Sequence, residues 1–200
     1  MKLFLATGNA NKIREMKEIL RDMPELELLS VRDGIAIPDV VEDGGTFEEN
    51  AVKKALAIAR TLRMPVIADD SGLQVAALGG APGVLSARYA GEHGNDAANN
   101  AKLIADLQGK ADRSARFVCV ICMALPDGTT HCYRGEVPGV IVDEAQGANG
   151  FGYDPHFWLP DIGKTMAELG AAEKNALSHR GRALAALKEH IRRDSGANHE

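Results

Sequence analysis

The sequence lacks the long apolar segment that a membrane protein needs. None of its 200 residues lies in a run of 18 apolar residues, and the apolar run near the N-terminus, residues 3–6, is too short for a signal peptide. It also lacks an excess of basic residues: the formal net charge is −5, so no general positive field attracts long nucleic acids. We therefore expect a soluble, cytoplasmic protein that binds neither a membrane nor nucleic acid. Any anionic ligand must be held by local cations.

Cysteine is scarce, with only Cys119, Cys122 and Cys132. The first two match a C-x-x-C spacing but lie in an apolar run typical of a β-strand. Because residues three apart in a strand point to opposite faces, they are not expected to share a metal ion. Cys132 follows a turn at Pro126-Asp127-Gly128, so it could lie near Cys122 across a hairpin. We expect the thiols to be reduced, as in most cytosolic proteins.

The length and the pattern of apolar residues predict one α/β domain over residues 1–193. Strands are expected at residues 2–6, 25–31 and 66–70, with helices between them at about 11–22 and 46–62; this alternation favours parallel strand pairs. Residues 115–125 and 129–142 predict an antiparallel hairpin, and so a mixed sheet or a second lobe. A long helix is expected from Glu173 to about Arg193, followed by a frayed tail at 194–200.

The stretch Val66-Ile67-Ala68-Asp69-Asp70-Ser71-Gly72 carries two adjacent acids at the end of an apolar run. A strand ending here would place both acids at the rim of a sheet. Since successive strand side chains point to opposite faces, Asp69 and Asp70 should have different roles. The alternative is an Asp-rich turn without chemistry, because Asp, Ser and Gly are common turn residues.

The segment after the first strand suits phosphate binding. Thr7-Gly8-Asn9 lies between a strand and a helix, where free backbone N–H groups and the helix dipole attract anions, and Lys12 adds a full positive charge. The spacing is not that of a Walker loop. The alternative interpretation is a helix that is simply capped by Asn9.

Two later segments offer groups for an oxygen-rich, aromatic ligand. Phe151-Gly152-Tyr153-Asp154 combines aromatic rings with a carboxylate, as a base-stacking platform would, although a buried aromatic turn is equally typical. Lys174, Ser178, His179 and Arg180 cluster near the start of the last predicted helix. Adjacent helical positions diverge too far for a Ser178–His179 nucleophile pair, so these side chains are better interpreted as hydrogen-bond donors.

Six motifs occur in order between residue 3 and about residue 190: Thr7-Gly8-Asn9-x-x-Lys12-x-x-Glu15, Phe47-x-Glu49-Asn50-Ala51, Ala68-Asp69-Asp70-Ser71-Gly72-Leu73, Gly79-Gly80-x-Pro82-Gly83, Phe151-Gly152-Tyr153-Asp154-Pro155 and Glu173-Lys174-Asn175-x-x-Ser178-His179-Arg180. Each alone is weak. Together the set closely resembles the inosine/xanthosine triphosphate pyrophosphatase family, the dITP/XTP pyrophosphatases.

The resemblance implies a Mg²⁺-dependent hydrolase that converts ITP, dITP and XTP to the monophosphate and pyrophosphate and so keeps deaminated purines out of nucleic acid. It implies an elongated mixed β-sheet flanked by helices, two lobes around a central substrate cleft, and a homodimer. Carried onto the matching positions, it implies Asp70 as the base acting on water, with Glu42 and Asp70 as metal ligands; Asp43 is the neighbouring alternative to Glu42. The implied substrate-binding residues are Thr7, Gly8, Asn9, Ala10, Asn11, Lys12, Lys54, Ser71, Phe151, Gly152, Tyr153, Asp154, Lys174, His179 and Arg180.

The implied specificity has a physical basis. Hypoxanthine and xanthine present a 6-oxo acceptor, which His179 or Arg180 can satisfy by donating, whereas adenine presents an amino donor there. Two other functions stay open: a related pyrophosphatase that acts on modified pyrimidine nucleotides, and a nucleotide sensor without turnover. The acids at Glu42 and Asp70 argue against the sensor.

Overall fold

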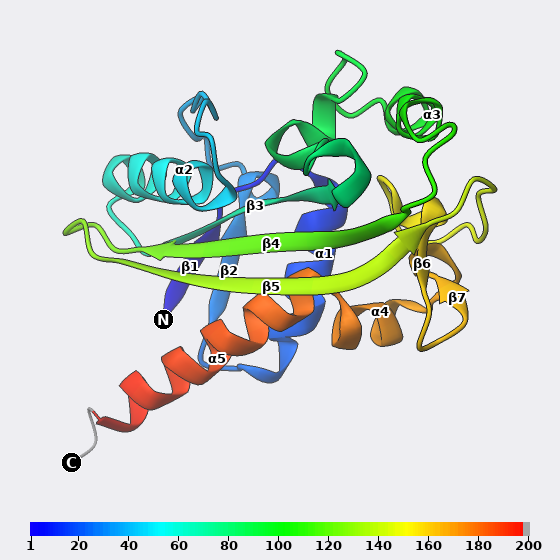
Figure 1. The fold of residues 1–200 in the computed structure, drawn as a ribbon. Helices are drawn as coiled ribbons and strands as arrows, with labels where there is room; N and C mark the ends of the chain where they lie inside the picture. Colours follow the sequence, from blue (N-terminus) through cyan, green and yellow to red (C-terminus); the bar gives the residue numbers. More distant parts are fainter. Residues whose placement is uncertain (198–200) are drawn as a thin grey trace. The chain divides into compact units, whose positions relative to one another are not determined.

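The computed structural model describes residues 1–197. Seven strands form one sheet in the order β2-β1-β3-β4-β5-β6-β7, with helices packed against it (Figure 1). This confirms the predicted α/β fold with a mixed sheet. Within the described part of the chain, every helix is too short or too polar to span a bilayer. The strands are β1 (Lys2–Leu5), β2 (Glu27–Ser30), β3 (Val66–Val75), β4 (Ser114–Ala124), β5 (Thr130–Ile141), β6 (Phe157–Leu159) and β7 (Lys164–Thr165), and the α-helices are α1 (Ala10–Ile19), α2 (Phe47–Leu62), α3 (Asp96–Asp106), α4 (Ala171–Leu177) and α5 (His179–Ala197).

The chain divides into two compact units, and each has its own hydrophobic core. Unit 1 comprises Met1–Asp70, Cys119–Gly135 and Arg180–Glu200, and unit 2 comprises Ser71–Val118 and Glu136–His179. Strands β3, β4 and β5 each contribute residues to both units. The expected single domain with two lobes and a cleft remains a prediction.

Unit 1 is built around parallel strands. β1 pairs in parallel with β2 and with β3, and Leu5 of β1 has Ile67 of β3 as its Cα partner. Apolar side chains of α1 and α5 pack on the sheet in one core, which includes Met16 and Leu184. Helix α2 lies on the other side of the strands from α5 in Figure 1. This two-sided cover explains why residues 3–5 of β1 and residues 66–68 of β3 are apolar without alternation.

Unit 2 has a core of its own around the parts of β3, β4 and β5 that belong to this unit. Leu73, Phe117 and Phe157 are among its buried members, and the rings of the last two lie 4.3 Å apart. The strand pairs β5–β6 and β6–β7 are antiparallel. The predicted hairpin is also present, since the Leu125 N–H donates to the Thr129 carbonyl at 2.9 Å between β4 and β5.

The cysteines take the places expected of reduced thiols. All three are free; Cys119 and Cys122 are buried on β4, and Cys132 is exposed on β5. A side-chain hydrogen bond joins Cys132 and Cys122, which confirms that the two meet across the hairpin.

The expectation that β3 ends at Asp70 is wrong. β3 continues to Val75, so the two acids lie inside a strand instead of at its end. Gly72 is not a turn residue but a point of close approach: a Cβ there would lie 2.3 Å from the Ser86 Oγ. The same hydroxyl accepts the Leu73 N–H at 2.9 Å. The glycine therefore admits a neighbouring segment against the strand, a role that glycine often has in strands.

The expectation of one long helix from Glu173 is also wrong. Helix α4 ends at Leu177 and α5 begins at His179, because Ser178 between them has an extended backbone (φ −67°, ψ 158°). Serine competes for backbone hydrogen bonds and favours helix ends, but its apolar neighbours keep helical spacing, so periodicity alone hid the break. α5 then runs to Ala197, and residues 198–200 of the predicted tail lie outside the described residues.

Candidate active site

The loop after β1 forms the N-terminus of α1. Asn9 is its cap: the Asn9 Oδ1 accepts the backbone N–H groups of Asn11 (2.9 Å) and Lys12 (3.3 Å). The Thr7 Oγ1 accepts the Asn9 N–H at 3.1 Å. Among the described residues no atom lies within 4 Å of a Cβ built on Gly8, so a ligand can approach this backbone. The capped helix is thus present, and a phosphate that takes the same amides must displace the Asn9 side chain.

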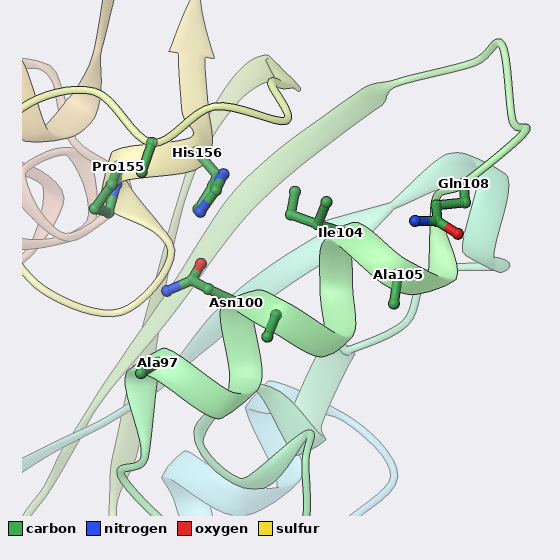
Figure 2. A pocket seen from close by; sticks show the side chains of 9 residues that line it. Ala97, Asn100, Ile104, Ala105, Gln108, Pro155 and His156 are labelled. Atoms are coloured by element: carbon green, nitrogen blue, oxygen red, sulfur yellow. The ribbon is translucent and has the colours of Figure 1, made fainter.

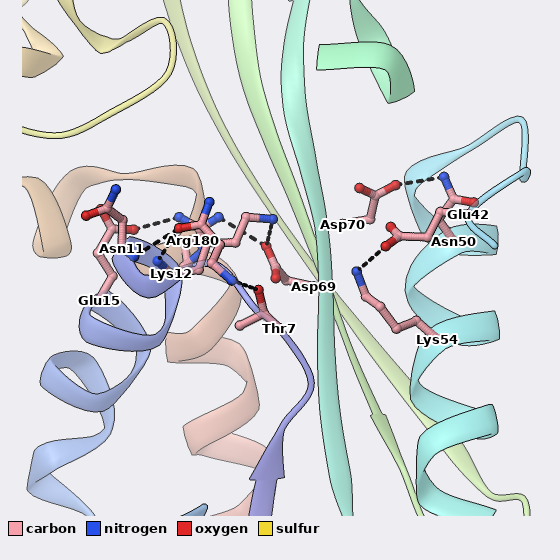
Figure 3. Close-up of polar contacts among 11 residues, drawn as sticks. Thr7, Asn11, Lys12, Glu15, Glu42, Asn50, Lys54, Asp69, Asp70 and Arg180 are labelled. Atoms are coloured by element: carbon pink, nitrogen blue, oxygen red, sulfur yellow. Dashed lines mark hydrogen bonds and ion pairs between the residues drawn. The ribbon is translucent and has the colours of Figure 1, made fainter. Parts of the chain in front are cut away.

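Asp69 lies at the centre of a buried ion-pair network on the α1 side of β3 (Figure 3). Its Oδ2 is 2.7 Å from the Lys12 Nζ and 3.1 Å from the Arg180 Nη2. The Arg180 Nη1 is 2.6 Å from the Glu15 Oε2. Glu15, Asp69 and Arg180 are all buried. Two cations and two anions balance here, which a buried charged cluster requires.

The network keeps Asp69 ionised. Burial alone would raise the pKa of this carboxyl, but the positive charges of Lys12, Arg180 and Lys54 outweigh it and hold the pKa far below its usual range. Burial would likewise lower the pKa of Arg180, and the negative charge of Asp69 reverses that shift, so the guanidinium stays charged. A permanently ionised Asp69 fixes the Lys12 ammonium but does not suit proton exchange near neutral pH.

Asp70 points to the opposite side of β3, as the alternation of strand side chains predicts (Figure 3). Its Oδ2 accepts a hydrogen bond from the Asn50 Nδ2 at 2.9 Å. Burial, with a smaller contribution from the charge of Glu42, raises the pKa of Asp70 to about 6, although Asn50, Lys12 and Lys54 each act in the other direction. A carboxylate with a pKa near 6 is a suitable proton acceptor at neutral pH. The pKa values of the two neighbouring acids are therefore shifted in opposite directions.

The acidic loop before α2 places Glu42, not Asp43, beside this pair. The Glu42 Oε1 lies 2.9 Å from the Nζ of Lys54, whose side chain is only 13% exposed. Asp43 instead pairs with Lys53, and both of these side chains are largely solvent-exposed. Glu42 is also the acid whose charge acts on Asp70. Of the two alternatives in this loop, the geometry favours Glu42.

The donor set suits a metal ion that is shared with a substrate. Among the described residues no group of three or more His, Cys, Asp or Glu side chains could hold a metal ion by itself. Asp70 and Glu42 offer two carboxylates, and Mg²⁺ typically binds one or two carboxylates together with substrate phosphates and water. The residues therefore fit an ion such as Mg²⁺, which completes its shell with water and with substrate phosphates, and they do not form a closed metal cage.

Unit 2 brings together a second group of the predicted residues. The Lys174 Nζ lies 2.6 Å from the Asp154 Oδ2 and 4.7 Å from the centre of the Phe151 ring. The Asp154 Oδ2 also accepts the Phe151 N–H at 2.9 Å. A Cβ on Gly150 would collide with this carboxylate at 2.0 Å, so only glycine leaves room for the pair. Phe151 is half-buried, whereas Asp154 and Lys174 are buried.

Other predicted substrate-binding residues of unit 2 have structural partners. The Tyr153 ring packs in the core, where a nucleobase cannot stack on it, and its hydroxyl donates to the Ser86 carbonyl at 2.7 Å. The Gly152 N–H donates to the Asp96 Oδ2 at 2.8 Å. His179 stacks on Phe117 with the ring centres 4.8 Å apart. Ser71 is half-buried on β3.

A separate hollow of about 530 Å³ lies in unit 2 beside α3 (Figure 2). Ile104, several alanines and His156 line it. The residues that the sequence predicts for the active site are not among its lining. Asn100, which does line it, donates to the Gly152 carbonyl at 2.8 Å and so connects α3 to the loop of Phe151.

Sequence reasoning assigned no role to two buried polar residues of unit 1. Glu15 pairs with Arg180 across 165 positions of the chain, and Asn50 bonds to Asp70 across 20. Both occur in the motifs that carried the family resemblance, so a signal was present. The motifs do not indicate which residue each side chain contacts, because such contacts form only when the chain is folded.

Comparison with known proteins places the chain in a family. Residues 3–190 match the model of the Ham1 family. The dITP/XTP pyrophosphatase of Geobacter sulfurreducens is 51% identical over 95% of this chain and 96% of its own length, and that of Desulfotalea psychrophila is 52% identical over 93% and 83%. The solved structure of the Staphylococcus aureus Ham1 protein is 45% identical, covers 97% of this chain and 100% of its own, and has a TM-score of 0.88. The chain belongs to the Ham1 family.

Proposed function

We propose that this protein hydrolyses the non-standard purine nucleoside triphosphates dITP, XTP and ITP to the nucleoside monophosphate and pyrophosphate, with Mg²⁺ as cofactor. The relatives named dITP/XTP pyrophosphatases support the reaction class, because they align with nearly the whole chain. The observation that carries the proposal is the arrangement around β3: a cation and a helix N-terminus on one side, and two carboxylates on the other.

Each side of β3 has its own task in the proposed reaction. The open backbone at Gly8, the α1 N-terminus and Lys12 hold the triphosphate, and Asp69 fixes the Lys12 ammonium. Asp70 accepts the proton of the attacking water; before a metal ion binds, burial holds the pKa of this carboxyl above its usual range. The water attacks the α-phosphorus in line with the departing pyrophosphate. Lys54 supplies a further cation toward the phosphates.

Glu42 and Asp70 would hold the Mg²⁺ ion, whose charge acidifies a bound water and neutralises the leaving pyrophosphate. In this structure Lys54 pairs with Glu42, so an arriving divalent ion must compete with the ammonium for that carboxylate. Releasing Lys54 toward the phosphates would couple metal binding to substrate binding. In this proposal Asp70 has two roles, as a ligand of the metal ion and as the base that accepts the proton of water.

The Phe151 loop of unit 2 is the proposed nucleobase site. Phe151 offers a half-buried ring, and the buried Lys174–Asp154 pair fixes the loop around it. His179 and Arg180 are proposed as donors to the 6-oxo group, although in unit 1 both terminal nitrogens of Arg180 already bind carboxylates. Tyr153 contributes through its backbone. We also propose a cytoplasmic homodimer, which sedimentation equilibrium and cell fractionation would test.

The decisive experiment measures pyrophosphate release from ITP, dITP, XTP, GTP, ATP and dTTP, with and without Mg²⁺. We expect turnover of the first three, with a preference of roughly 10⁴ over ATP if polar pairing selects the base. Equal rates on all six would refute the 6-oxo specificity, and a preference for dTTP would favour a pyrimidine enzyme. Asp70→Asn should abolish turnover while nucleotide binding persists. Undiminished turnover in that variant would remove Asp70 as the base.

A further inference from the structure

We infer that Asn50 is a positioning residue that ties Asp70 to the loop carrying Glu42 and so sets the distance between the two proposed metal ligands. The inference rests on the proposed function. It gives Asn50 a role that neither the motif containing it nor the relatives' names assign. Asn50 lies in the first turns of α2 and is 2% exposed. It touches both sides of the site, as Figure 3 shows for its contact with Asp70.

The orientation of the Asn50 amide follows from its partners. The Gly44 backbone N–H, which can only donate, lies 2.8 Å from the Oδ1. The Nδ2 must therefore face the Asp70 Oδ2, 2.9 Å away, and donate to it. One planar side chain thus grips a backbone group of the loop and a carboxylate of β3. Because the two ends are chemically different, neither Asp nor Leu can replace both.

Gly44 shows how closely this contact is built. A Cβ at position 44 would lie 2.7 Å from the Asn50 Oδ1 and 2.8 Å from the Glu49 Cβ. A side chain there must push the loop off the amide. At Gly45, one residue further, the nearest atom to an added Cβ is the Glu49 Oε2 at an ordinary 3.7 Å. Glycine at 44 is therefore required by the Asn50 contact, whereas glycine at 45 is not.

The loop is held from α2 at further points, which lets the Asn50 contact fix Glu42 in place. The Thr46 Oγ1 accepts the Glu49 N–H at 3.1 Å, and the Glu49 Oε2 accepts the Gly45 N–H at 2.7 Å. Lys54, one turn along α2 from Asn50, pairs with Glu42. These contacts hold the loop against α2, beside Asp70. Contacts that orient metal ligands in this way typically change metal affinity or activity by about 10- to 100-fold when removed.

The test compares metal affinity in variants that break one end of the contact at a time. Asn50→Asp keeps an acceptor for the Gly44 N–H but loses the donor to Asp70. Gly44→Ala keeps the donor but displaces the loop, and Asn50→Ala removes both. Gly45→Ala is the matched control. Affinity is measured as Mn²⁺ binding to the protein without nucleotide, followed by electron paramagnetic resonance, and as the Mg²⁺ concentration that gives half-maximal pyrophosphate release.

We expect Asn50→Ala and Gly44→Ala to weaken Mn²⁺ binding and to raise the Mg²⁺ requirement by about 10- to 100-fold. Asn50→Asp should lower kcat at saturating Mg²⁺ because it sets a second carboxylate against Asp70. The KM for nucleotide at saturating Mg²⁺ should stay within about threefold, since the metal site is then filled and neither Lys12 nor Lys54 is changed. Gly45→Ala should match the wild type in each measurement.

A merely structural role would lower the urea midpoint of Asn50→Ala and leave metal affinity unchanged. Metal affinity within twofold of the wild type in folded Asn50→Ala or Gly44→Ala overturns the inference, as does a wild-type protein that binds no divalent ion. If Asn50→Ala does not fold, Gly44→Ala and Asn50→Asp decide. If the wild type hydrolyses no nucleotide, the proposed function fails, but the Mn²⁺ comparison still tests the positioning role.

Discussion

Replacing Asp69 by Asn tests the buried network most directly. Asp69 has no exposed surface and binds Lys12 at 2.7 Å and Arg180 at 3.1 Å. The change keeps the volume but leaves the buried Arg180 with Glu15 as its remaining anion in this network. Removing one partner of a buried ion pair costs about 3–5 kcal/mol, because a charge is left uncompensated. For a protein of this size, that corresponds to a fall in Tm of roughly 6–20 °C.

The assay is urea unfolding at pH 7, with Asp43→Asn as the matched control. Asp43 pairs with Lys53 at the surface, with side chains 68% and 45% exposed, so solvent screens the pair and its loss should destabilise the fold far less than the loss of Asp69. A loss in Asp69→Asn as small as that of the control would refute the view that the network stabilises the fold. Slower turnover should accompany the instability, since Lys12 loses the anion that fixes it.

The same variant has a pH signature. Because the folded pKa of Asp69 lies below its unfolded value of about 3.9, its ionisation stabilises the fold above that value. The contribution is lost as the pH falls through the folded pKa. The difference in unfolding free energy between wild type and Asp69→Asn should therefore stay constant from pH 6 to 8 and narrow below about pH 4. A difference that grows toward acid pH would contradict the assignment of Asp69 as the ionised member.

Two further predictions concern single side chains. The pKa of Asp70 shifts in the opposite direction from that of Asp69, from the ordinary 3.8 up to about 6. The ionised carboxylate therefore destabilises the fold above pH 6, and Asp70→Asn should be more stable than the wild type by up to roughly 3 kcal/mol at pH 8. Thermal unfolding should show the gain vanish near pH 4, and a gain that persists there would count against this explanation. Tyr153→Phe removes a buried hydrogen bond to the Ser86 carbonyl and should cost about 1–2 kcal/mol in urea unfolding. The ITP-to-ATP preference of that variant should stay unchanged, and a lost preference would return the Tyr153 side chain to the base site.

Much of the fold was predictable because its signals are local. Thr46 begins α2 as its sequence context indicates, with its hydroxyl on the Glu49 N–H. The Pro126-Asp127-Gly128 turn joins two strands, and Asn9 begins α1. These features depend on turn chemistry, capping and apolar periodicity over a few residues, which a sequence displays directly. The family motifs add roles for the acids, and these roles stay predictions.

Two predictions from the sequence were wrong: the end of β3 at Asp70 and the continuous helix from Glu173. The sequence around Gly72 is typical of a turn, yet β3 passes through it. Because Gly72 has no side chain, Ser86 can pack directly against the strand there. Ser178 breaks an apparently continuous helix. At Gly72, packing against the segment of Ser86 decided between two conformations that are locally acceptable. At Ser178, one extended residue interrupts a helical apolar pattern that its neighbours continue.

From its residues alone, the sequence determined an α/β protein with two adjacent strand acids, a cationic helix start and an aromatic glycine loop. Only the tertiary structure decided that Asp69 is buried with Arg180 while Asp70 faces Asn50. The alternation of a strand predicts that two neighbours differ, but not which one meets cations. That choice depends on groups 111 positions away for Asp69 and 20 positions away for Asp70, and the free energy of such contacts exists only in the folded chain.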